Sequence, residues 1–198
     1  MKDLMTHMMP EDARIEDAPA LAQLVVMAGD GMPLLVWEEM REPGEDVWDV
    51  GARRAAREEG QFSYRKARVI RRDGTVISSL VGYPLDEVVP EAELDDLPPL
   101  FRPLVELENE AVPSWYVNVL ATFPEARCKG AAKALLQDAE AQARASGQTR
   151  MSIITSDDNP ALKLYEHVGN RQITRRPVVR DGWKTDSKEW ILLIKNLG

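Results

Sequence analysis

A short glycine-containing loop at residues 127–132 carries the residue types that bind phosphate. It reads Arg127-Cys128-Lys129-Gly130-Ala131-Ala132 and comes directly before an alanine-rich helical pattern. The first amides of a helix lack intrahelical acceptors and the helix dipole adds positive potential, so such a loop suits an anion. Gly130 keeps side-chain bulk away from the anion, while Arg127, Lys129 and Lys133 supply positive charge. A solvated helix end is the alternative, and the loop alone does not separate the two interpretations.

Two elements must hold this loop in place. An apolar strand pattern from Trp115 to Thr122 precedes it. Behind it, apolar residues recur at helical spacing at Leu136, Ala139 and Ala143. Gly147 follows the last periodic residue and predicts the end of the helix there. The pattern is therefore strand, loop and helix, with the loop at the start of the helix.

A second segment opens with Asn159, a helix-capping residue, followed by proline at the first helical position. Together the two segments resemble the Gcn5-related N-acetyltransferase family. The first motif of that family, Gln/Arg-x-x-Gly-x-Gly/Ala, is matched by Arg127, Gly130 and Ala132. Its second motif, a pattern of asparagine, alanine, tyrosine and glycine, is matched by Asn159, Ala161, Leu164, Tyr165 and Gly169.

The sequence departs from the family pattern at two positions. Cys128 stands where the family usually has glycine, and Asn170 stands where it usually has phenylalanine. Neither change removes a group that the resemblance assigns to the cofactor. The resemblance implies an α/β (α+β) fold in one domain over residues 1–198. Its central sheet is expected to be mixed and mostly antiparallel, flanked by helices, with splayed central strands.

The resemblance also implies direct transfer of an acetyl group from acetyl-CoA, a cosubstrate, to a primary amine of a small molecule or peptide. In the family, backbone groups at the end of the central strand bond the pantetheine arm, which maps onto Leu120, Ala121 and Thr122. Asn159 would bond the cofactor arm from its helix end. The loop amides would hold the pyrophosphate, at Arg127, Cys128, Lys129, Gly130, Ala131 and Ala132.

Tyr165 is the residue that the resemblance assigns to protonating the departing thiolate. A phenol with a pKa of about 10 is a reasonable proton source for a thiolate. The alternative is that Tyr165 only packs, with its hydroxyl bonded to backbone. His167 lies two residues further on, roughly 200° round the helix, so we expect it at the surface rather than in the chemistry.

A group near the start of the central strand is expected to remove the proton of the amine. The resemblance implies a glutamate or an ordered water there, and Glu108 and Glu110 are the candidates. Tyr116 or Asn118 could instead orient a water. Glutamates in a run commonly form a solvated face, so the sequence leaves the identity of the base open.

Charge and cysteine content limit the partners and the compartment. The formal net charge of −8 argues against nucleic-acid binding and favours a cationic acceptor. One cysteine excludes an internal disulfide, and two histidines and one cysteine have no metal-ligand spacing. No apolar run approaches a membrane span, and the first residues lack the core of a signal peptide. We expect a cytoplasmic enzyme with a small-molecule amine acceptor and no membrane or nucleic-acid partner, and we include a homodimer among its expected states.

The remaining chain predicts further elements and one long segment without any. Asp73-Gly74 is a strong hairpin signal. From Leu85 to Pro113 no strand or long helix pattern is visible, and we expect an acidic cover that shapes the acceptor pocket. The other predictions are strands near residues 13–15, 63–71, 75–83, 150–155, 171–179 and 189–195, and helices near residues 17–28, 33–40, 47–60 and 159–168.

Two other functions fit parts of the sequence. The domain could bind an acyl-CoA as a sensor or structural partner without turnover, although Asn159 and Tyr165 together favour catalysis. A site for a different nucleotide would need the Gly-Lys-Ser/Thr ending of a P-loop, which the sequence does not contain.

Overall fold

The dipeptide Asp73-Gly74 joins two antiparallel strands, as predicted. Strands β2 (Ala67–Arg72) and β3 (Thr75–Leu85) pair from Ala67 opposite Val81 to Arg72 opposite Thr75. Both turn residues have positive φ, 50° at Asp73 and 79° at Gly74. This is the geometry of the two-residue turns whose twist matches that of the flanking strands. The hairpin therefore follows directly from two residues that tolerate the left-handed region.

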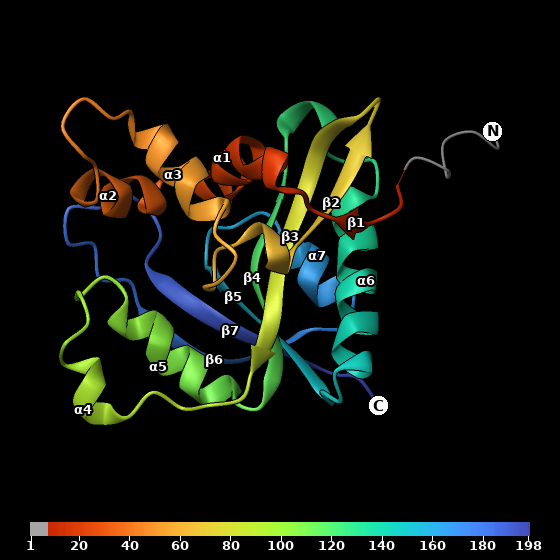
Figure 1. Ribbon diagram of the computed structural model, residues 1–198. Coiled ribbons are helices and arrows are strands. Elements are labelled where there is room, and N and C mark those ends of the chain that lie inside the picture. The colour runs from red at the N-terminus through yellow and green to blue at the C-terminus, as the bar shows by residue number, and fades with distance from the viewer. Residues whose placement is uncertain (1–7) are drawn as a thin grey trace. The chain divides into compact units, whose positions relative to one another are not determined.

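The strands form a seven-stranded sheet in the order β1-β2-β3-β4-β5-β7-β6 (Figure 1). Strands β4 and β5 are parallel, whereas the pairs β1–β2, β2–β3, β5–β7 and β6–β7 are antiparallel. The predicted mixed, mostly antiparallel sheet is confirmed. The remaining strands are β1 (Glu11–Asp12), β4 (Ser114–Thr122), β5 (Arg150–Ser156), β6 (Arg171–Pro177) and β7 (Glu189–Asn196).

The computed structural model describes residues 8–198, and its contacts define two compact units. The first unit contains residues 8–82 and Val119–Asp138, and the second contains Tyr83–Asn118 and Ala139–Gly198. Strands β3 and β4 each contribute residues to both units. The organisation as one domain stays a prediction, and residues 1–7, on which the signal-peptide argument depends, lie outside the described part.

The first unit contains three helices that contact one another (Figure 1), α1 (Ala18–Ala28), α2 (Met32–Glu39) and α3 (Val47–Ala55). Trp37 is buried and stacks on Phe62, with ring centroids 6.1 Å apart. A Cβ atom on Gly51 would lie 2.3 Å from the Trp37 ring, so a glycine lets α3 approach α2. The first strand was predicted near residues 13–15, but β1 lies at Glu11–Asp12 and residues Ile15–Asp17 form a 3₁₀ turn, η1.

The second unit contains helix α5 (Arg102–Ala111), which packs against β5, β6 and β7. The prediction that no helix occurs between Leu85 and Pro113 was wrong, because α5 and the short α4 (Glu91–Leu94) both lie there. Proline at the start of a helix supports it, since its missing N–H would have no acceptor anyway. Pro103, Leu107 and Ala111 are buried at a spacing of four residues, which is the apolar stripe of a helix.

Helix α6 (Ala131–Ala145) is the alanine-rich helix predicted behind the loop. Its residues Leu136, Ala139 and Ala143 are fully buried. Gly147 has φ of 81° and its N–H donates to the Arg144 carbonyl at 3.1 Å, which ends the helix as expected from its position. Among residues 8–198, no helix is long and apolar enough to cross a bilayer.

Strand β4 continues well past its pairing with β5. The parallel pairs run from Trp115 opposite Met151 to Val117 opposite Ile153. β4 extends five residues further, to Thr122. The end of the central strand therefore carries backbone groups that this ladder does not use, which is the feature expected of splayed central strands.

Candidate active site

The loop before α6 is exposed and leads directly into the first turn of that helix. After the 3₁₀ turn η3 (Pro124–Ala126), residues 127–130 are exposed and α6 begins at Ala131. The Gly130 carbonyl accepts the Ala134 N–H at 3.0 Å, so Gly130 closes the first helical turn. The amides that follow it lie in the first turn, where no helical carbonyl is available as an acceptor. These amides are suited to bind phosphate oxygens.

Cys128 preserves the conformation that glycine usually supplies at its position. Its φ is 58°, in the left-handed region, and its side chain is exposed. Left-handed backbone costs an L-residue roughly 1–2 kcal/mol. The departure from the family motif thus changes the side chain and adds strain, but it leaves the loop in the glycine-like conformation.

Two basic side chains of the loop bond to neighbouring backbone. Arg127 Nε donates to the Thr122 carbonyl at 3.1 Å, and Lys129 Nζ donates to the Glu125 carbonyl at 3.1 Å. Lys133 is exposed one turn into α6. These contacts brace the loop against the end of β4 and concentrate positive charge around its amides.

The end of β4 is held by a serine of β3. Ser78 is fully buried, and its Oγ donates to the Ala121 carbonyl at 2.8 Å and lies 2.8 Å from Thr122 Oγ1. Ser78 therefore bonds the Ala121 carbonyl, and the neighbouring Thr122 carbonyl accepts from Arg127 Nε. The assignment of Leu120, Ala121 and Thr122 to the pantetheine arm stays a prediction.

We expect Gly130→Leu to weaken acetyl-CoA binding by roughly tenfold or more, because the side chain would project among the phosphate-binding amides. Gly130 has φ of 93°, and a Cβ there would meet no atom within 4 Å, so the fold itself has space for it. Isothermal titration with acetyl-CoA measures the change.

Gly147→Leu is the matched control for this variant. Gly147 has φ of 81°, also has open space around its Cβ position, and ends the same helix. Both variants should lose stability by roughly 1–2 kcal/mol from the left-handed backbone, but only Gly130→Leu should lose affinity. Equal affinities in the two variants would remove the phosphate site from this loop.

Asn159 starts a turn rather than a helix. Its Oδ1 accepts the Ala161 N–H at 2.9 Å, and its carbonyl accepts the Leu162 N–H at 3.0 Å. Helix α7 runs from Leu162 to His167, so the predicted start at Asn159 was wrong by three residues. An asparagine side chain that bonds two residues ahead favours a turn in competition with a helix. The side-chain amide nitrogen of Asn159 stays the group assigned to the cofactor arm, as a prediction.

Tyr165 lies on α7 with its side chain buried, while His167 on the same helix is exposed. Burial raises the pKa of the Tyr165 phenol to about 12, so it carries its proton throughout the neutral range. Asn170 is buried, and both its backbone N–H and its Nδ2 donate to the Tyr165 carbonyl at 3.0 Å. The residue that replaces the family phenylalanine therefore caps the end of α7, a role that the sequence analysis did not identify.

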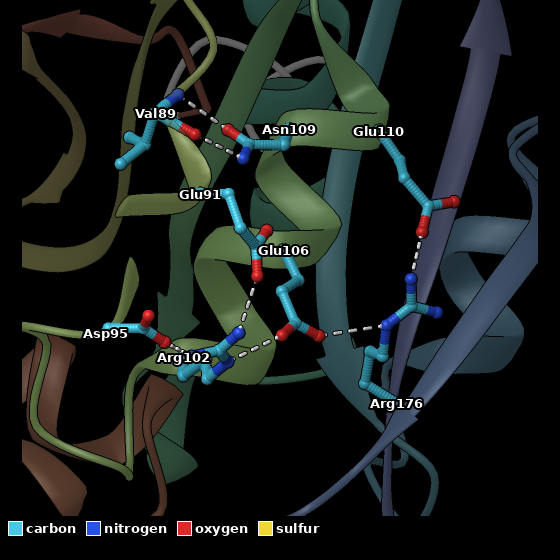
Figure 2. Close-up of polar contacts among 8 residues, drawn as sticks. All are labelled: Val89, Glu91, Asp95, Arg102, Glu106, Asn109, Glu110 and Arg176. Carbon is cyan, nitrogen blue, oxygen red and sulfur yellow. Dashed lines mark hydrogen bonds and ion pairs between the residues drawn. The ribbon is translucent and has the colours of Figure 1, made fainter. Parts of the chain in front are cut away.

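Two of the three glutamates of α5, Glu106 and Glu110, form ion pairs (Figure 2). Arg176 of β6 binds both Glu106, at 3.1 Å, and Glu110. Glu106 also accepts from Arg102 Nε at 2.9 Å, and Arg102 further binds Glu91 and Asp95. Glu110, one of the two candidate bases, is thus held in an ion pair. Asn109 bonds both backbone groups of Val89 at 2.8 Å, which ties the preceding loop to α5.

Glu108, the other candidate base, lies outside this network and is half-buried. Burial raises its pKa from the usual 4.5 to about 7, and a hydrogen bond from Tyr116 opposes the rise. Tyr116 is 3% exposed, and the edge of the Tyr83 ring contacts it with centroids 5.7 Å apart. The structure therefore brings together a carboxyl group that titrates near neutrality and two buried phenols.

The predicted site residues fall into two sets. Leu120–Thr122 and residues 127–132 belong to the first unit, and Glu108, Asn159 and Tyr165 belong to the second. The first set is predicted to bind the cosubstrate. In the second set, Asn159 is predicted to bind the cofactor arm, and Glu108 and Tyr165 to transfer protons. Among residues 8–198, no cluster of histidine, cysteine, aspartate and glutamate could hold a metal ion.

A mixed sheet whose central strand extends beyond its pairing with its parallel neighbour, followed by a glycine-containing loop and a helix, is the architecture of an acyltransferase. The sequence model of the Acetyltransferase (GNAT) family matches residues 34–169, more than two thirds of the chain. The chain therefore belongs to the GNAT family of acetyltransferases, which are acetyl-CoA-dependent enzymes. The resemblance seen in the two sequence motifs is confirmed.

Solved structures share this fold over nearly the whole chain. A structure described as an acetyltransferase has a TM-score of 0.66 at 23% identity, covering 96% of this chain and 100% of its own. An N-acetyltransferase from Staphylococcus aureus Mu50 has a TM-score of 0.60 at 23% identity, covering 94% and 99%. The polyamine N-acetyltransferase of Drosophila melanogaster, which forms N-acetylagmatine, has a TM-score of 0.66 at 12% identity, covering 94% and 98%. A comparison with curated proteins gives no match.

Proposed function

We propose that this protein transfers the acetyl group of acetyl-CoA to a primary amine of a small molecule or peptide by direct attack. The observation that carries the proposal is the match to the acetyltransferase family over residues 34–169. The half-buried carboxyl group of Glu108, whose pKa burial raises to about 7, supports a catalytic role over simple binding of an acyl-CoA. A base works best when its pKa lies near the working pH, because it is then both ionised and basic enough to accept a proton.

The loop and the end of β4 fit the cosubstrate. Residues 127–132 present first-turn amides and basic side chains, and the space around Gly130 is open. Bound acetyl-CoA supplies the activated acetyl thioester. The backbone of Leu120–Thr122 and the side chain of Asn159 would align the arm that carries it, and holding two reactants in attack geometry lowers the barrier by roughly 7 kcal/mol or more in favourable cases.

Glu108 and Tyr165 divide the proton transfers between them. A primary amine is mostly protonated at neutral pH, since alkyl ammonium groups have a pKa of about 10, so the ammonium form must release one proton to solvent before its nitrogen can attack. Glu108 accepts the second proton, which the nitrogen loses as the N–C bond forms. Tyr165 donates a proton to the sulfur as the C–S bond breaks. Burial keeps the phenol protonated until that step and would also raise the basicity of a thiolate formed beside it.

The acceptor is expected to be cationic. The net charge of −8 attracts cations, and α4 and α5 contribute several of the carboxylates. Agmatine and polyamines are reasonable first acceptors to test, because the Drosophila enzyme of the same fold forms N-acetylagmatine. The cytoplasmic location and the homodimer depend on sequence alone and stay predictions.

The test is a screen of polyamines, amino acids, aminoglycosides and short peptides, scored by release of the CoA thiol. Thiol release that depends on a primary amine, with the acetylated amine seen by mass spectrometry, supports the proposal. Binding of acetyl-CoA with no turnover across the set would instead favour the acyl-CoA sensor.

The acidic segment from Leu85 to Pro113 allows a separate test of acceptor binding. We expect Glu91→Gln combined with Asp95→Asn to raise the KM for the acceptor several-fold, because both carboxylates hold Arg102, which in turn binds Glu106 on the helix of Glu108. The affinity for acetyl-CoA should not change. Glu93→Gln, at an exposed position of α4, is the control. If only stability changed, the segment would be a cover without a role in acceptor binding.

A further inference from the structure

Ser78 of β3 is a fully buried polar residue whose hydroxyl contacts the last two residues of β4. Its Oγ donates to the Ala121 carbonyl at 2.8 Å and lies 2.8 Å from Thr122 Oγ1. All three residues belong to the first unit. A buried hydroxyl needs hydrogen-bond partners to offset the loss of water. Ser78 finds them in β4, and it thereby ties the end of that strand to β3.

The bond to Ala121 fixes the direction of the backbone at the end of β4. Successive residues of a strand direct their N–H and C=O groups to opposite edges. The Ala121 carbonyl is directed to β3, and the Phe123 N–H, two residues later, donates to the Ile77 carbonyl of β3 at 3.0 Å. The N–H and C=O groups of Leu120 therefore point to the other edge of β4, three residues beyond the last pair of the ladder with β5, at Val117.

The contact with Thr122 leads on to the loop before α6. The Thr122 carbonyl accepts from Arg127 Nε at 3.1 Å, and Arg127 is the first residue of the loop 127–132. Hydrogen bonds thus connect the buried Ser78, the end of β4 and the start of the loop, all within the first unit. The segments assigned to the pantetheine arm and to the pyrophosphate therefore share one anchor in β3.

We propose that Ser78 is a positioning residue for the cosubstrate, which holds the end of β4 in the conformation that binds the pantetheine arm. The inference rests on the proposed function, in which Leu120–Thr122 align that arm. Without the hydroxyl, the end of β4 loses its bond to β3 and leaves this conformation for part of the time. The apparent Kd of a ligand rises in proportion as the binding conformation becomes less populated.

Ser78→Ala removes the hydroxyl and leaves the rest of the buried side chain. Isothermal titration should show a Kd for acetyl-CoA that is raised roughly three- to tenfold, the usual effect of one lost hydrogen bond. The kcat at saturating acetyl-CoA should stay within about twofold of the wild-type value, because saturation restores the binding conformation. A purely structural role would lower the melting temperature and leave the Kd of the folded protein unchanged.

Ser114→Ala is the matched control. Ser114 is the first residue of β4, is also fully buried, and its Oγ lies 2.7 Å from Ser152 Oγ. Both variants lose one buried serine contact of the sheet and should melt at similarly lowered temperatures, but only Ser78→Ala should bind acetyl-CoA more weakly.

Two results would overturn the inference: an unchanged Kd in Ser78→Ala, or an equal rise of the Kd in both variants. Neither would contradict the acetylation of amines. A Kd raised in Ser78→Ala alone, in a protein that acetylates no amine, would support the inference and disprove the proposed function.

Discussion

Glu108→Gln should lower kcat for the best acceptor by roughly 10²–10⁴-fold, the usual contribution of a general base. In the wild-type enzyme the rate should rise with pH through about 7, because burial raises the pKa of Glu108 to that value and only the carboxylate accepts a proton. The glutamine variant should lose this limb of the profile. The affinity for acetyl-CoA, measured by titration, should remain unchanged. An unaltered limb near pH 7 would show that another group is the base.

The stability of the same variant separates catalysis from folding. Glu108 ionises less readily in the folded protein than in the unfolded chain, so its contribution to stability is present below about pH 4.5 and is lost as the pH rises through about 7. A shift from 4.5 to about 7 corresponds to about 3 kcal/mol. Glutamine keeps an acceptor for the Tyr116 hydroxyl and carries no charge. Glu108→Gln should therefore melt several degrees higher than the wild type at pH 8 and at nearly the same temperature at pH 4.5.

Tyr165→Phe should also lower kcat by roughly 10²–10⁴-fold, with acetyl-CoA affinity and melting temperature close to those of the wild type. The substitution removes one hydroxyl and almost no volume from a buried ring. The pKa of Tyr165 is about 12, so ionisation of the phenol lies above the pH range of an ordinary assay. The wild type and Tyr165→Phe should therefore show pH profiles of the same shape within the assay range, with a lower kcat for the variant at every pH.

His167→Gln is the control for this experiment, because His167 is exposed on the same helix. The rates must be compared under conditions in which chemistry, and not product release, limits turnover. A normal kcat in Tyr165→Phe together with lowered stability would assign Tyr165 to packing. It would leave the acetyl transfer itself intact, since a water could protonate the thiolate.

Local signals in the sequence predicted the parts of the fold that depend on local physics. The turn at Asp73-Gly74 and the end of α6 at Gly147 both require positive φ, and glycine supplies it. Signals from proline and asparagine were misleading, because both residues occur in turns as well as at helix starts. No long helix was predicted between Leu85 and Pro113 although Pro103 lies in the first turn of α5, and Asn159 was interpreted as a helix cap although its side chain forms a turn. Whether a proline or an asparagine begins a helix or lies outside it depends on where the helix starts, and packing sets that start.

Short motifs in the sequence selected residues 127–132 and Tyr165, and their assignment to the site stays a prediction. In the structure, Cys128 has positive φ, as a glycine at its position could. The choice among the glutamates was not predictable. Glu106, Glu108 and Glu110 are equivalent in sequence, but Arg176 on β6 pairs with two of them and leaves Glu108 beside Tyr116. That distinction depends on partners about 70 residues away.

The length of β4 has a consequence for how binding measurements must be interpreted. Tyr116, which contacts the candidate base, and Leu120, which is assigned to the cofactor arm, are four residues apart on one strand. If both residues have these roles, a shift of the strand on binding of one substrate would reach a residue that serves the other. The two binding free energies are then coupled, and the coupling must be equal in both directions. A substitution at Asn118 or Val119 that alters the affinity for one substrate therefore cannot be assigned to that substrate's site until the other affinity has been measured as well.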